Sequence, residues 1–192
     1  MLQDLYAAKT KSTRTAAATA LGNYVVKAGL RSLALYGILD DLTRAARSTK
    51  DPLEREGAMV GFEELFRKLQ PQGGADPYLI GLLPDILDRY HESGKTASIA
   101  TAAERAAKQL VKLSPPELAP KMIEHFFTYL DGNAKWKCKV GALELLSTFA
   151  VSAKDQVAER LGEYVPRLTG SMRDTKAEVR WRDRCGWPPR LD

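Results

Sequence analysis

The apolar residues of this chain recur with the spacing of amphipathic helices. Across residues 78–90, apolar side chains follow the i, i+3, i+4, i+7 spacing that places them on one stripe of a helix. Similar stripes span residues 118–130 and 157–172, and a weaker one spans 30–42. No stretch alternates with the period of a β-strand, so the pattern predicts an all-α protein. The stripe of 78–90 consists of Leu79, Leu82, Leu83, Ile86, Leu87 and Tyr90.

A short polar turn and a second helix, richer in alanine and other small residues, follow each of these first helices. The turns contain Gly, Asn, Asp, Ser and Thr, which tolerate tight turns. Pro52 stands where proline is accepted, in the first turn of a helix. The predicted second helices span 52–70, 95–113, 135–151 and, incompletely, residues from Lys176 onward.

The starts of the second helices recur at about 40 residues, which is typical of HEAT or armadillo repeats. One further period back, an alanine-rich helix runs from Lys11 or Ser12 to Ala28. Pro84 and Pro166 interrupt the first helix of a pair two periods apart, where we expect kinks. One hairpin cannot bury its stripe alone, and stacked hairpins can. The predicted fold is an α-solenoid of HEAT repeats over residues 1–179, with about four helical hairpins in a right-handed superhelix.

The periodicity fails after Arg180. Gly186 and the prolines at 188 and 189 would end any helix there, so the stripe of 157–172 lacks a partner helix. We interpret 180–192 as an irregular tail and a truncation of a longer protein, because a terminal repeat normally carries a polar cap. Removal of the residues after Thr169 is expected to change the melting temperature little.

Composition adds moderate constraints. The chain has 192 residues, a mass of 21.2 kDa and a formal charge of +5. This positive charge indicates a mild preference for acidic partners such as nucleic acid. No apolar run approaches the roughly 20 residues that span a bilayer, so no membrane association is predicted. Cys138 and Cys185 are too few for a disulfide framework, which favours a reducing compartment such as the cytoplasm.

Catalytic and cofactor chemistry is weakly represented. Residues 94–96 read Gly-Lys-Thr, as in a phosphate loop, but the first glycine of that motif would fall at Arg89, on a helix rather than after a strand. His91 and His125 lie in different repeats without a second ligand at metal-binding spacing.

No serine, cysteine or threonine of the sequence lies in a recognisable nucleophile motif such as G-x-S-x-G. We interpret the carboxylate pairs at 40–41 and 63–64 as solvated faces. The sequence therefore predicts no catalytic residue, cofactor or metal.

The strongest functional signal is the position of certain lysines. One lysine falls at the equivalent turn of each successive repeat, and a stacked solenoid aligns equivalent turns along one edge. The turns would then form a basic ridge that binds an acidic partner. A tryptophan among the lysines could add a contact by stacking its indole on a base. Alternatively, the lysines are ordinary surface residues and the indole belongs to the core. The candidate residues are Lys50, Lys95, Lys135, Trp136, Lys137, Lys139, Lys176 and Arg180.

Three strings suggest a family. Residues 133–143 (NAKWKCKVGAL), 152–158 (SAKDQVA) and 172–179 (MRDTKAEV) resemble the N-terminal HEAT region of fungal translation elongation factor three. The HEAT segment of the large general-control kinase-activator protein is similar too. The resemblance covers about residues 10–179, extending more loosely through 55–58 (REGA) and 82–84 (LLP).

The resemblance implies a parent ABC-family ATPase that binds the ribosome and promotes release of tRNA from the exit site. In that family the HEAT region is a ribosome-contacting arm, and later cassettes hydrolyse ATP. This chain carries no Walker A motif or ABC signature, so no catalytic residue is transferred, and from Trp181 it departs from the family pattern. The expected partner is the ribosome, both RNA and protein. A tubulin-binding scaffold and a kinase-activator adaptor are the alternatives, and the oligomeric state stays open.

Overall fold

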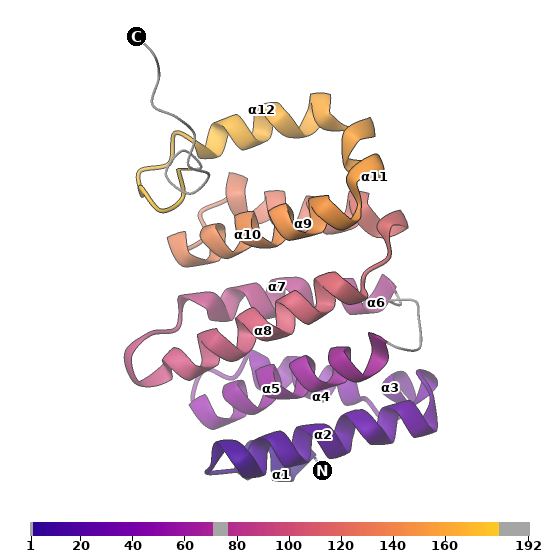
Figure 1. Cartoon of the computed structure of the whole chain (residues 1–192). Coiled ribbons are helices and arrows are strands. Elements are labelled where there is room, and N and C mark those ends of the chain that lie inside the picture. The colour runs from indigo at the N-terminus through magenta and orange to yellow at the C-terminus, as the bar shows by residue number, and fades with distance from the viewer. Residues whose placement is uncertain (1, 71–76, 181–192) are drawn as a thin grey trace. The chain divides into compact units, whose positions relative to one another are not determined.

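A computed structural model describes residues 2–70 and 77–180 (Figure 1). The described residues form helices and turns without a strand, which confirms the predicted all-α class. The chain divides into two compact units, Met1–Pro115 and Pro116–Asp192. None of the described helices is both long enough and apolar enough to cross a membrane.

The first unit is built around three long helices, α2, α5 and α8. The central helix α5 packs against both of the others and also against α1 and α4 (Figure 1). The helix α7 and the 3₁₀ turn η2 cover a further side of α8. The elements are α1 (Leu2–Ala7), α2 (Lys11–Ala28), α3 (Arg31–Leu35), α4 (Ile38–Ala46), α5 (Pro52–Leu69), α6 (Pro77–Ile80), α7 (Leu83–Leu87), η2 (Asp88–His91), η3 (Gly94–Thr96) and α8 (Ala97–Leu113).

Helix α5 forms where the sequence predicts it, because its signals are local. Asp51 caps its start by accepting a hydrogen bond from the backbone N–H of Leu53 at 2.8 Å, and Pro52 occupies its first turn. Two glycines allow other helices to approach closely. A Cβ at Gly57 would lie 2.9 Å from the backbone oxygen of Leu5, and one at Gly61 would lie 2.9 Å from Leu42 Cδ2. These glycines explain how α5 contacts α1 and α4 while burying most of its length.

The first helix predicted over residues 78–90 is wrong as a single helix. The structure divides it into α6, a turn at 81–82, α7 and η2. Pro84 lies in the first turn of α7, because its ring and missing N–H are tolerated only there. The predicted burial of the stripe is nevertheless confirmed, since all six of its residues are at most 7% exposed.

The weaker stripe of 30–42 is divided in the same way. Gly37, with φ of +60°, separates α3 from α4, and only a residue without a Cβ adopts this conformation readily. The three predicted second helices, in contrast, match α5, α8 and α10 (Trp136–Ser152) to within two residues at each end, and the predicted alanine-rich helix coincides with α2.

The second unit packs α9 (Ala119–Asp131) against α10 and against α12 (Leu161–Ser171). Phe127 of α9 meets Tyr164 of α12, with ring centroids 5.6 Å apart, and Arg167 covers the same Phe127 ring at 4.1 Å. The Arg167 guanidinium also forms an ion pair with Glu124 at 2.8 Å. The remaining elements are η4 (Pro116–Leu118) and α11 (Lys154–Glu159).

The predicted second helix from Lys176 onward is wrong over the described residues. Residues 172–180 form turns, with one helical hydrogen bond from the Arg180 N–H to the Lys176 oxygen at 3.2 Å. A single turn fixes several residues for one hydrogen bond and does not propagate without an apolar stripe to bury. Residues 181–192, including most of the predicted tail, lie outside the described part.

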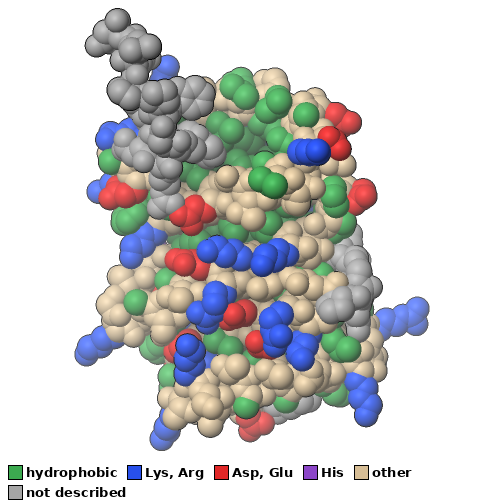
Figure 2. Space-filling view, viewed as in Figure 1, with side chains coloured by type: hydrophobic (Ala, Val, Ile, Leu, Met, Phe, Trp, Pro, Cys, Tyr) green, Lys and Arg blue, Asp and Glu red, His purple; other side chains and the backbone are tan. Residues whose placement is uncertain are grey.

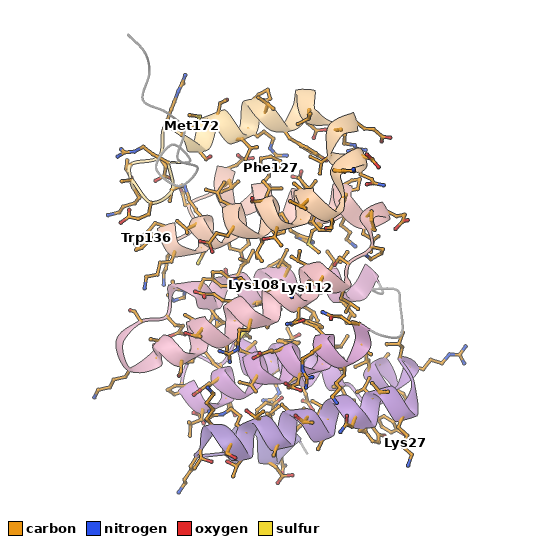
Figure 3. The ribbon with its side chains drawn as sticks, viewed as in Figure 1. Lys27, Lys108, Lys112, Phe127, Trp136 and Met172 are labelled. Atoms are coloured by element: carbon orange, nitrogen blue, oxygen red, sulfur yellow. The ribbon has the colours of Figure 1, made fainter. Side chains whose placement is uncertain are left out.

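The face of α12 directed away from α9 is exposed, as the missing partner helix predicts. Leu161 and Val165 are each 47% exposed. Met172, which follows the last residue of α12 and is labelled in Figure 3, is 44% exposed. The turns after α12 are nevertheless anchored, because Val179 is fully buried and Lys139 Nζ lies 2.9 Å from Asp174 Oδ2. Both contacts argue against the expectation that residues after Thr169 contribute little to stability.

Replacement of Gly57 by alanine should destabilise the protein by about 1–3 kcal/mol, because the added Cβ would meet a backbone oxygen that cannot rotate away. Gly162→Ala is the matched control in α12, since a Cβ there would meet no atom within 4 Å. It should leave the stability unchanged or raise it by up to about 1 kcal/mol. Urea unfolding followed by circular dichroism measures both, and equal effects would contradict close packing at Gly57.

The ion pair between Lys139 and Asp174 predicts a pH dependence. Burial raises the pKa of the Asp174 carboxyl, but hydrogen bonds from Lys139 and from the Lys176 N–H outweigh it and lower the pKa below its ordinary 3.8. The stabilisation is therefore complete above that value and is lost as the pH falls through the folded-state pKa.

Asp174→Asn should cost about 1–2 kcal/mol at neutral pH, since Lys139 keeps a largely buried charge without its partner. The difference in unfolding free energy between the wild type and this variant should shrink in acid. A difference that stays constant with pH would show that the carboxylate charge is unimportant.

Candidate partner-binding surface

The turn before α5 presents Lys50 to solvent. Within this turn the Asp51 N–H donates to Ser48 Oγ at 3.3 Å, and Asp51 in turn caps α5. Lys50 is exposed and forms no ion pair with the described residues around it. The local hydrogen bonds therefore hold the backbone of the turn and leave the lysine available.

The turn before α8 presents Lys95 in the same manner. Gly94 has φ of +62°, and the Thr96 hydroxyl donates to the Ser93 oxygen at 3.0 Å. Lys95 lies exposed in the short η3 turn, so it begins a 3₁₀ turn rather than α8 itself. The Gly-Lys-Thr sequence of residues 94–96 therefore lies in a connection between two helical segments.

These two turns lie side by side because Arg55 joins them. Its guanidinium donates to the Ser48 oxygen at 3.0 Å and lies 2.9 Å from Glu92, and the side chains of Arg55 and Glu92 are each 11% exposed. The Nε of Arg55 is close enough for an ion pair with Glu92 but is not aligned for a hydrogen bond. Burial raises the pKa of the Glu92 carboxyl, but the nearby Thr96 hydroxyl and the charge of Arg55 together outweigh it, so the net shift is downward.

In the second unit, the start of α10 gathers two lysines and an indole. Lys135 occupies the N-cap position and is exposed, and Trp136 is 37% exposed, so its indole is not part of the core. Lys137 Nζ lies 5.8 Å from the centroid of the Trp136 ring, a cation–π contact. Figure 3 shows Trp136 at the end of its helix.

Lys139 differs from the other candidates, because it is already engaged. Its side chain is 15% exposed and its ammonium pairs with Asp174 in the turn after α12. This contact places Lys176, which is exposed, in the turn adjacent to the start of α10, and exposed Arg180 lies one helical turn further along. Lys139 therefore positions this turn, and its charge is neutralised.

Each unit thus holds together two equivalent turns through one largely buried ion pair. Lys50 and Lys95 share an edge of the first unit, and Lys135, Lys137 and Lys176 share an edge of the second. A basic ridge that runs through both units stays a prediction.

Sequence reasoning missed the lysines on the outer face of α8. Lys108 and Lys112 are exposed and follow each other at i, i+4 spacing (Figure 3). Figure 2 shows lysine and arginine side chains gathered over this part of the first unit. Their helical spacing was the available signal, but it is a weaker pattern than a lysine that recurs in successive turns.

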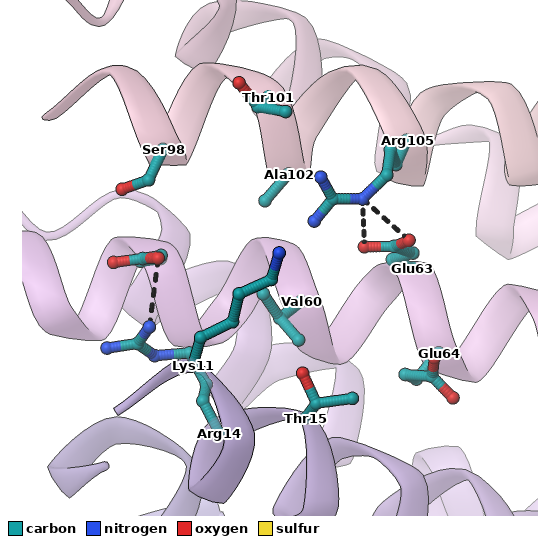
Figure 4. A pocket seen from close by; sticks show the side chains of 11 residues that line it. Lys11, Arg14, Thr15, Val60, Glu63, Glu64, Ser98, Thr101, Ala102 and Arg105 are labelled. Carbon is teal, nitrogen blue, oxygen red and sulfur yellow. Dashed lines mark hydrogen bonds and ion pairs between the residues drawn. The ribbon is translucent and has the colours of Figure 1, made fainter. Parts of the chain in front are cut away.

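The interpretation of residues 63–64 as a solvated carboxylate pair is wrong. Glu64 is 8% exposed and pairs with Arg67, and Glu63 accepts two hydrogen bonds from Arg105 Nε at 2.8 and 2.9 Å. Both carboxylates line a groove formed by α2, α5 and α8 (Figure 4). The partner of Glu64, Arg67, lies one turn further along α5, and the partner of Glu63, Arg105, lies on α8.

A metal centre is not apparent in the described ranges, 2–70 and 77–180. No group of three or more histidine, cysteine or carboxylate side chains in that part of the chain could hold an ion.

Similarity to known proteins agrees with this architecture. Residues 14–182 match the family described as EF3 N-terminal HEAT repeat. Elongation factor 3 of Gonapodya prolifera is 30% identical over 167 residues, which cover 87% of this chain and 15% of that protein. The mRNA export factor elf1 of Schizosaccharomyces pombe is 34% identical over 152 residues, or 78% of this chain and 14% of that protein.

The eIF-2-alpha kinase activator GCN1 of Saccharomyces cerevisiae is 32% identical over 171 residues, which cover 88% of this chain and 6% of that protein. The chain therefore spans less than a sixth of the length of each of these relatives. No solved structure matches the chain. With a family match over most of its length and a helical architecture to fit, the chain belongs to the EF3 N-terminal HEAT repeat family.

Proposed function

We propose that this chain is a HEAT-repeat binding module of the translation apparatus that docks on the ribosome through its turn lysines. The observation that carries the proposal is the recurrence of an exposed lysine in the turn that follows the first helix of each pair, found twice in the first unit and twice in the second. The similarity to elongation factor 3 supplies the partner.

The chemistry of the turns suits an RNA backbone. Lysine ammonium groups neutralise phosphates and release counterions, and an aromatic side chain can stack on a base. The second unit offers both, because Lys135 and Trp136 are exposed next to each other. Lys139 is left out of this proposal, since contact with a phosphate would break its ion pair with Asp174.

The proposal includes no catalysis by this chain. The match is confined to the HEAT region of much longer proteins, so it transfers no ATPase cassette. The module would act by binding alone.

A kinase-activator adaptor is the second candidate function, and the identity of 32% to GCN1 over 88% of the chain favours it. Such an adaptor would bind a protein partner without RNA. None of these relatives is described as a tubulin-binding protein, so the tubulin-binding alternative rests on the charge and on the turns that carry tryptophan and lysine.

Sedimentation of the purified chain with ribosomes over a salt series tests the proposal. Binding should weaken steeply with salt, because phosphate contacts release counterions. The double variant Lys135→Glu/Lys137→Glu should bind at least about tenfold more weakly at low salt, and its salt slope should fall by about two, one for each lost lysine contact.

The matched control is Lys121→Glu/Lys154→Glu, which changes the net charge equally at two exposed lysines of the same unit. It should leave most of the affinity intact. Equal losses in both double variants would reduce the effect to net charge, and salt-independent binding would exclude the turn lysines as the contact. Binding to a protein partner after nuclease treatment, without ribosome binding, would favour the adaptor.

A further inference from the structure

A groove crosses the second-helix face of the first unit. Its floor is α5 and its walls are α2 and α8, and it encloses about 520 Å³ (Figure 4). The groove shares no residue with the turn lysines, although Lys11 and Ser98 lie in the first turns of α2 and α8. The charged and polar residues of the lining include Lys11, Arg14, Glu56, Glu63, Ser98 and Arg105.

The acidic side chains of the groove are already paired. Arg14 lies 2.9 Å from Glu56, and Glu63 accepts both its hydrogen bonds from the Nε of Arg105. Glu64 pairs with Arg67 and accepts a further hydrogen bond from Thr19. None of these carboxylates therefore offers a strong site for an additional cation.

The basic side chains, in contrast, retain donors without a partner among the described residues. Arg105 uses only its Nε toward Glu63, so its two terminal nitrogens keep their N–H groups available, and Figure 4 shows them directed into the groove. Lys11 is exposed, forms no ion pair within the described part of the chain and extends from the α2 wall into the same space (Figure 4). Arg14 is 3% exposed, and its Nε is buried without a hydrogen-bond partner.

We propose that this groove binds an acidic segment of a partner protein, with a glutamate or aspartate carboxylate held between Lys11 and Arg105. A guanidinium can bind one carboxylate through Nε and a second through its terminal nitrogens, and such charge-assisted hydrogen bonds are the strong ones. The Ser98 hydroxyl, on the α8 wall, adds a neutral donor and acceptor for the backbone of the segment.

A peptide fits the groove better than a nucleic-acid strand does. The lining holds three cations, Lys11, Arg14 and Arg105, and three carboxylates, Glu56, Glu63 and Glu64, so it has no net charge. Successive phosphates along a strand would meet the floor carboxylates, and like charges in close apposition are unfavourable. A single carboxylate on a peptide meets Lys11 and Arg105 and avoids the rest.

Fluorescence anisotropy with a short labelled serine-rich peptide that carries a single glutamate tests the proposal. The same peptide with glutamine in place of glutamate is the ligand control, and oligouridylate of equal length is the competitor. The glutamate peptide should bind at least about tenfold more tightly than the glutamine peptide, and oligouridylate should not displace it. Backbone amide shifts on titration should change at Ser98 and Thr101, which line the groove.

Lys11→Glu should weaken peptide binding about tenfold, because it replaces an attractive charge by a repulsive one. This variant should fold, because Lys11 is exposed and an acidic residue in the first turn of α2 agrees with the helix dipole. Lys27→Glu, in the last turn of the same helix, is the matched charge control and should bind like the wild type. Arg105→Gln should also weaken binding, and its circular dichroism and melting temperature show whether it folds without the pair to Glu63.

Equal binding of the glutamate and glutamine peptides, equal losses in Lys11→Glu and Lys27→Glu, or displacement by oligouridylate would each overturn the proposal. These outcomes are separate from ribosome binding, because the groove and the turn lysines share no residue. Loss of one activity with retention of the other would therefore identify which surface is used.

Discussion

The structure depends on one constraint, namely that a helical hairpin cannot cover its own apolar stripe and has to be covered by its neighbours. Helix α5 meets this constraint fully, since other helices pack on several of its sides and eleven of its residues are buried. It does so through glycine at the points of closest approach, where α1 and α4 would otherwise collide with a side chain. Helix α12 shows the opposite case. It packs on α9 through Tyr164 and Arg167 and leaves Leu161, Val165 and Met172 largely uncovered, because no second helix follows it within the described residues.

The parts of the fold that sequence could predict are those that local chemistry determines. The second helices match their predicted bounds closely, since each is a continuous run of helix-forming residues, and in α5 the capping Asp51 and Pro52 also mark the start. Of the predicted first helices, 118–130 is continuous and forms α9, whereas 30–42, 78–90 and 157–172 are divided. The stripe of 78–90 is buried throughout, but Leu30, Leu161, Val165 and Met172 of the other stripes are exposed. Apolar spacing reports which side chains are buried, whereas continuity depends on single backbone positions such as Gly37 and Pro84. A stripe therefore persists across a break in the helix.

The candidate site, like the fold, was predictable from sequence only in part. Lysines in equivalent turns follow from the repeat period, and the structure shows that neighbouring turns within a unit do lie together. The state of each lysine does not follow, because Lys139 and Lys135 are equally basic in sequence and only the position of Asp174, 35 residues away, neutralises Lys139. The groove on the first unit could not be predicted from sequence for the same reason. Its pairs join residues of different helices, as Arg105 and Glu63 do across a separation of 42 residues, and composition alone suggested a solvated acidic face there.

Both surfaces use one physical arrangement, in which some charges hold the backbone and others remain available. Arg55 with Glu92 and Lys139 with Asp174 are largely buried, and removal of either partner would leave an uncompensated charge in a poorly solvated place. These pairs consequently fix the geometry and are unsuited to exchange partners. Lys50, Lys95, Lys135 and Lys11 are exposed without such a partner among the described residues, so binding an anion costs them only their hydration and side-chain freedom. The distinction lets a chain with a modest excess of positive charge offer two different surfaces. In the two proposals, rigid turns would present ammonium groups to a highly charged partner, and a groove without net charge would select a ligand that carries a single carboxylate at the right place.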